Sequence, residues 1–194
     1  MSTPSEAVSE FFAHLQAGDW AAAVKSIRPA EAELCRARIL SRTFRMMQLR
    51  QALSGETPLV MKPMPSADDQ GPDPELIARW RDLPVEGMDV STAGDLLQLP
   101  APVFLERLLA LHRCDEDGNA FLPWGGKRVE ILEVTPTSED AARVRYAYRD
   151  QPPDEYDPKT LQAFQRAWEI DVYRVGSEWL LDVPAETMGP IPIF

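Results

Sequence analysis

Apolar residues in the first third of the chain recur at helical spacing. The first stripe has four members: Val8, Phe11, Phe12 and Leu15. The preceding TPSE is typical of a capping box with proline in the first helical position, and Gly18 is placed to end the helix. Asp19 is placed to cap a second, short helix, WAAAVKSI, and Pro29 opens a third that extends to about Leu53. The first third is therefore predicted to be helical.

The middle of the chain begins with a loop and continues with short helices. Residues 54–73 contain four prolines and two glycines and show no sustained period. Three helices are predicted after them, in DPELIARWRDL, in STAGDLLQL with Ser91 or Thr92 as cap, and in APVFLERLLALHR. We interpret residues 54–126 as a helical insertion.

After residue 126 the period changes from helical to alternating, which predicts at least four strands. They are KRVEILEV, ARVRYAYR, AWEIDVYRV and GSEWLLDV, and Gly176-Ser177 forms a tight hairpin turn between the last two. Helices followed by strands indicate an α+β fold with an antiparallel sheet. We expect residues 1–194 to form a single domain of this class.

Composition is ordinary for a globular protein, with 44% hydrophobic and 26% charged residues. No apolar run has the length of a membrane helix, and the first residues lack the pattern of a signal peptide. Cys35 and Cys114 are too few for a disulfide framework, so we expect a cytoplasmic protein with reduced thiols.

The net charge of −11 is unevenly distributed, because residues 66–120 hold four basic and twelve acidic side chains. Such a chain repels nucleic acid, so no nucleic-acid partner is expected, and no membrane partner. The charge serves solubility, or it forms an acidic surface that captures a basic partner.

Two stretches resemble NTF2-like domains, the group that includes SnoaL-like and ketosteroid-isomerase-like proteins. The opening SEAVSEFFAHLQAGDWAAAVKSI resembles their two N-terminal helices with a Gly-Asp junction, and WEIDVYRVGSEWLLDV resembles their final hairpin. AARVRYAYR fits the strand before that hairpin. The resemblance implies a strongly curved antiparallel sheet wrapped around the helices, with a pocket at the open end.

Many members of this group bind small hydrophobic molecules, some catalyse proton transfer, and many are dimeric accessory modules. The sequence departs from the family at residues 54–126, which are longer and more helical than usual. This insertion could lid the pocket, fill it, or form a small helical subdomain.

The stretch HRCDEDGN, residues 112–119, has the residue types of a metal site but not their positions. Read as a calcium loop from Asp115, it has Ala120 where the turn needs glycine and Gly126 where it needs glutamate. There is no C-x-x-C pair for zinc, and His112 and Cys114 would point about 200° apart in a helix. A capping turn is predicted, with no metal and no cofactor.

Three residues are candidates for proton transfer. Asp171 could act as a base with Tyr146 or Tyr148 as oxyanion donor, and His14 could border the pocket as a general base. Structural roles in the core or on the surface are favoured for all three. Arg38, Arg42 and Arg45 share one side of the third helix and could clamp an anion, but a solvated face is favoured.

Aromatic side chains are the candidate walls of a ligand pocket, with plain core packing as the alternative. They are Trp20, Trp124, Tyr146, Tyr148 and Trp168. No nucleophile elbow, Walker loop, dinucleotide fingerprint or HExxH sequence occurs, and PWGGK at 123–127 is a loop.

These observations predict a non-catalytic binding or accessory module that holds a small hydrophobic ligand. One alternative is an isomerase or dehydratase with an Asp/Tyr/His set. Another is an acidic protein-interaction module of the inhibitor or immunity type. The partner is an unspecified small molecule or protein, and a homodimer through the sheet is a further expectation.

Overall fold

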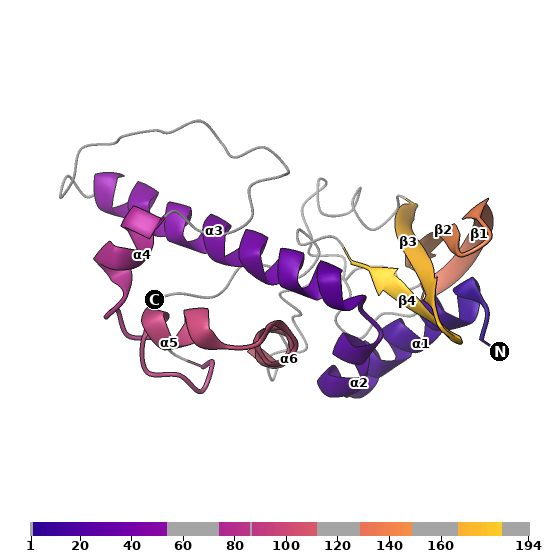
Figure 1. Ribbon diagram of the computed structural model, residues 1–194, viewed down its shortest axis with the longest axis horizontal. Coiled ribbons are helices and arrows are strands. Elements are labelled where there is room, and N and C mark those ends of the chain that lie inside the picture. The colour runs from indigo at the N-terminus through magenta and orange to yellow at the C-terminus, as the bar shows by residue number, and fades with distance from the viewer. Residues whose placement is uncertain (1, 54–73, 86, 112–128, 149–166, 184–194) are drawn as a thin grey trace, which may run out of the picture.

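The computed structural model describes residues 2–53, 74–85, 87–111, 129–148 and 167–183. Within these ranges six helices precede a four-stranded sheet (Figure 1). The helices are α1 (Pro4–Ala17), α2 (Trp20–Lys25), α3 (Pro29–Leu53), α4 (Pro74–Trp80), α5 (Ala93–Gln98) and α6 (Ala101–Leu111). The strands are β1 (Val129–Ser138), β2 (Ala141–Tyr148), β3 (Trp168–Val175) and β4 (Glu178–Asp182). This order confirms the predicted α+β class.

Local capping signals account for where three of the helices begin. Thr3 and Glu6 form the predicted capping box of α1, and the helix ends at Gly18, whose φ of 71° is left-handed. The Asp19 carboxylate accepts from the Ala22 amide at the start of α2. Of the two caps considered for α5, Thr92 is the one used, in a capping box with Asp95.

The sheet is an antiparallel meander in the order β1-β2-β3-β4. Gly176, with a φ of 65°, and Ser177 make the predicted two-residue turn, since Val175 pairs with Glu178. Alternation within β2 follows the prediction: Val144 and Tyr146 are buried and Arg143 is exposed. The buried residues form the inner face of the sheet, and the charged residues between them form its outer face.

The two edges of the sheet differ. The β4 edge is extended by the connection between α2 and α3, where the Arg28 amide donates to the Leu181 carbonyl at 2.9 Å and the Leu181 amide donates to Ser26 at 2.8 Å. The β1 edge carries register shifts and Pro136, both of which discourage pairing with another strand. The expected homodimer through the sheet stays a prediction. Because both edges of the sheet are poorly suited to pairing, the outer face of the sheet is the better contact surface for such a dimer.

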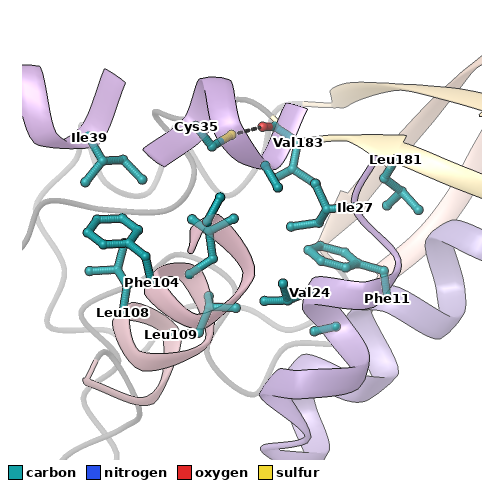
Figure 2. Packing of buried hydrophobic residues seen from close by; sticks show 14 of the residues in the cluster. Phe11, Val24, Ile27, Cys35, Ile39, Phe104, Leu108, Leu109, Leu181 and Val183 are labelled. Atoms are coloured by element: carbon teal, nitrogen blue, oxygen red, sulfur yellow. Dashed lines mark hydrogen bonds between the residues drawn. The ribbon is translucent and has the colours of Figure 1, made fainter. Parts of the chain in front are cut away.

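One cluster of buried residues joins the sheet to all the helices around it. Figure 2 shows Phe104 and Leu108 of α6 facing Ile39 of α3, with Val24 of α2 nearby. Phe11 of α1 lies on the other side of Val24, beside Leu181 of β4. α6 thus packs on α2 and α3, and α1 is the helix that packs on the sheet.

The described helices of the 54–126 insertion extend the helical part of the molecule. α4 and α5 lie near the end of α3 that is distant from the sheet (Figure 1), while α6 packs on α2 and α3. Trp80, Leu96 and Phe104 of these helices belong to the same buried cluster as the sheet, and the three arrangements considered for residues 54–126 stay predictions. None of the helices in the described ranges combines the length and apolar character needed to cross a membrane.

Candidate functional site

Aromatic residues gather at one end of the inner face of the sheet. Tyr146 and Tyr148 are two apart on β2 and so share a face, and Tyr146 pairs directly with Trp168 on β3. Phe12 of α1 packs against both tyrosines, with ring centroids 4.9 Å from Tyr146 and 6.2 Å from Tyr148. We call these four residues, Phe12, Tyr146, Tyr148 and Trp168, the aromatic end.

Burial decreases across the aromatic end. Phe12 and Tyr146 are only 2% and 3% exposed, whereas Tyr148 and Trp168 are half-buried. Val129 of β1, also half-buried, lies opposite Tyr148 in register. The cluster therefore has a closed base and a partly exposed rim of large apolar groups.

Both tyrosine hydroxyls at the aromatic end are held in their neutral form. Burial raises the pKa of Tyr146 from 10.0 to about 12. Burial is also the main reason that the pKa of Tyr148 is raised, with the neighbouring Tyr146 as a second cause. The two hydroxyls are hydrogen-bonded to each other. At neutral pH they are donors and acceptors of hydrogen bonds, and neither is a phenolate base.

The other two candidate wall residues are not joined to this cluster by a described contact. Trp20, the first residue of α2, is half-buried beside Gly18, where an added Cβ would lie 3.7 Å from its ring. Among the described ring contacts none links Trp20 to the aromatic end. Trp124 lies outside the described residues.

The three proton-transfer candidates occupy different parts of the fold. Asp171 is on the outer face of the sheet, where Arg143 Nε and Nη2 donate to its two oxygens at 2.8 and 3.1 Å. Tyr146 points to the opposite face, so one site cannot contain both. His14 lies at the junction of α1 and α2, with its Nδ1 3.7 Å from Asp19 Oδ2. The predicted Asp/Tyr/His set is therefore not assembled.

A second polar cluster, which the sequence did not reveal, lies where α3 begins beside β4. The Arg28 Nε donates to Asp182 Oδ1 at 2.6 Å, and the guanidinium lies 4.4 Å from the centroid of the Tyr173 ring. About two turns further along the chain, the buried Cys35 thiol donates to the Val183 carbonyl at 2.9 Å. These contacts join residues about 150 positions apart, and no local sequence signal marks them.

Glu31 is the unusual ionisable group of this second cluster. It is 9% exposed, and burial is the main cause that raises the pKa of its carboxyl. The nearby Asp182 acts in the same direction, while Arg38 and Arg28 oppose it. The carboxyl borders an open groove of about 450 Å³, lined by Arg28, Ala30, Glu31, Glu33, Leu34, Arg36 and Ala37.

A groove of similar size, about 460 Å³, lies between α4 and α5. Its polar lining includes Arg81, Asp82 and Asp95. Asp95 is already used by the capping box of α5. Neither of these two grooves includes a residue of the aromatic end.

Within the described ranges no cluster of three or more histidine, cysteine, aspartate or glutamate side chains could hold a metal ion. The stretch 112–119 considered for metal binding lies outside those ranges. Seven of the twelve acidic residues of segment 66–120 also lie outside those ranges. The five acidic residues of the segment that are described are interspersed with three arginines. In chain order these eight are Glu75, Arg79, Arg81, Asp82, Asp89, Asp95, Glu106 and Arg107.

Comparison with known proteins found no relative of this chain. The chain matches no protein-family model, and neither a curated protein nor a solved structure shows significant similarity to it. The geometry described above is therefore the basis for the functional argument.

Proposed function

We propose that the protein is a non-catalytic binding module with an NTF2-like fold, which holds a small apolar molecule at the aromatic end. The observation that carries the proposal is the half-buried rim of Tyr148 and Trp168 above the buried pair Phe12 and Tyr146. Large aromatic side chains contribute much binding free energy when a ligand covers their apolar surface. A rim of such side chains favours a flat or ring-shaped ligand. A cytoplasmic location, inferred from the two widely spaced cysteines, belongs to the same proposal.

The position of the polar groups supports binding over catalysis. The best carboxylate candidate, Asp171, is neutralised by Arg143 on the outer face of the sheet. The tyrosines on the inner face stay protonated, so they orient a ligand by hydrogen bonds without removing a proton from it. Neutral hydroxyls facing the ligand are suited to a binding module. An isomerase that moves a proton would instead need a base facing the ligand.

The proposal is tested with the neutral apolar dye Nile red, whose emission rises and shifts to the blue in an apolar site. We expect saturable binding to the wild-type protein, and binding weakened about tenfold or more by Trp168→Ala, which removes half of the rim. Tyr173→Ala, an aromatic truncation on the outer face, is the matched control and should bind the dye as the wild type does.

A second control separates the rim from other apolar surface. Leu53→Ser removes the most exposed large apolar side chain of α3, at 78% exposure, and should leave the dye signal unchanged. Equal signals from Trp168→Ala and Tyr173→Ala, or loss of signal only in Leu53→Ser, would refute binding at the aromatic end. Circular dichroism establishes that each variant is folded.

A further inference from the structure

The second half of α3 has an exposed face that combines arginines with apolar residues. At about 100° per residue, six side chains fall within an arc of roughly 100°. We call them the basic–apolar face: Arg38, Arg42, Arg45, Met46, Leu49 and Leu53. No acidic residue lies between positions 34 and 53 of α3, so the face has one sign of charge.

The apolar members of this face are in contact with solvent. Met46, Leu49 and Leu53 are 51%, 38% and 78% exposed, and their spacing of three and four residues forms one stripe along the helix. The opposite side of α3 is the one that enters the core, where Phe44 is buried and its ring stacks on Trp80 at 6.1 Å. The stripe therefore does not serve the core, and exposed apolar surface of this kind marks interaction sites.

Two of the arginines of the face, Arg42 and Arg45, differ from the paired arginines elsewhere in the described residues. Arg28, Arg143 and Arg174 each bind an aspartate through two nitrogens. Arg42 and Arg45 make no ion pair with any residue in the described ranges, although the chain has 31 acidic residues. Two guanidinium groups beside an apolar stripe are suited to carboxylates that flank the apolar face of another helix.

We propose that the basic–apolar face docks an acidic amphipathic helix of a partner protein. The stripe supplies the apolar contact, and Arg42 and Arg45 supply charge complementarity and orientation. An anionic membrane is the other surface that a basic–apolar helix could meet, but so extended a surface meets the charge of the whole protein, which is −11, whereas a single acidic helix meets only the basic–apolar face. A second copy of the chain is disfavoured by the same repulsion. The inference is independent of ligand binding at the aromatic end.

The probe is a fluorescein-labelled synthetic peptide with leucines on one helical face and glutamates on the other, measured by fluorescence anisotropy. We expect saturable binding that weakens as salt is raised, because the arginines are exposed and screened. Met46→Ser with Leu53→Ser should weaken binding about tenfold, and Arg42→Glu with Arg45→Glu should weaken it at least as much and abolish the salt dependence. Arg42, Met46 and Leu53 are exposed and Arg45 is part-buried, and none of the four is in the buried cluster, so the fold should tolerate these changes.

Matched controls decide the outcome. Val175→Ser removes an equally exposed apolar residue, 51% exposed, from the β3–β4 hairpin and should leave peptide binding unchanged. A scrambled peptide of the same composition should not bind. The proposal is overturned if the wild type does not bind the peptide, if the α3 variants bind it as the wild type does, or if they lose only binding to vesicles of phosphatidylglycerol and phosphatidylcholine.

Discussion

Two tyrosines on neighbouring strands show how the face of the sheet to which a side chain points determines its burial and its pKa. Tyr146 faces inward, is 3% exposed and has its pKa raised by burial. Tyr173 faces outward and lies beneath the guanidinium of Arg28. Only the first contributes to the aromatic end, and its neutral hydroxyl is maintained by the removal of water from around it.

The stability of the fold should therefore depend on the Tyr146 hydroxyl at alkaline pH. Its pKa is raised in the folded state, so the stabilisation is complete below pH 10 and is lost as the pH rises toward about 12. Tyr146→Phe should move the midpoint of alkaline unfolding upward, measured by far-UV circular dichroism across this range. Tyr173→Phe is the control, and an equal shift in both variants would exclude burial of Tyr146 as the cause.

Sequence alternation predicted that Val144, Tyr146 and Tyr148 share a face, and the burial of the first two confirms it. It could not predict that Asp171 lies on the other face. That relation depends on the register of β2 against β3, and a slip of one residue would exchange the two faces of a strand. The pairing of Asp171 with Tyr146 was for this reason an alternative that the sequence left open, with a structural role for Asp171 favoured.

At the level of elements, helix ends were predictable and long-range pairing was not. The caps at Thr3, Asp19 and Thr92 are local, because each side chain binds an amide three residues away. The pairing of the α2–α3 connection with β4 has no local signal. It depends on the Arg28 amide meeting Leu181, which the hydrophobic pattern of neither segment specifies.

The Arg28–Asp182 pair should stabilise this junction more than a comparable exposed pair stabilises the sheet. The Asp182 side chain is 17% exposed, so Arg28→Ala leaves a mostly buried carboxylate without its partner and should cost about 2 kcal/mol. Arg143→Ala breaks a similar bidentate pair on the exposed face, where solvent screens the charges, and should cost clearly less than Arg28→Ala. Urea unfolding measures both values, and equal costs would contradict the role of burial.

At the level of the whole molecule, the buried cluster spans the helical part and the sheet without a break. Phe104 of α6 and Val144 of β2 belong to it, and both are 0% exposed. The α+β class was readable from the change of hydrophobic period along the chain. The packing of α6 on α2 and α3 was not, since an amphipathic helix shows that it has a buried face but not what that face contacts.

A continuous core predicts that the helical part and the sheet unfold together. Phe104→Ala should cost about 3–5 kcal/mol and lower the melting temperature of one shared transition. Far-UV circular dichroism follows the helices, and hydrogen exchange of the β2 and β3 amides follows the sheet. Two separate transitions, with only the helical one shifted by the substitution, would show instead that the two parts are independent.

The contact between the start of α3 and β4 has a consequence for the order of events during synthesis. Ser26 and Arg28 leave the ribosome long before Leu181, so the N-terminal helices form before the strand that pairs with their connection has been synthesised. Until then the Cys35 thiol lacks its acceptor at Val183, and Arg28 lacks Asp182. A chain interrupted before β4 has helices but no closed junction, so the commitment to the native fold is deferred until β4 has been synthesised.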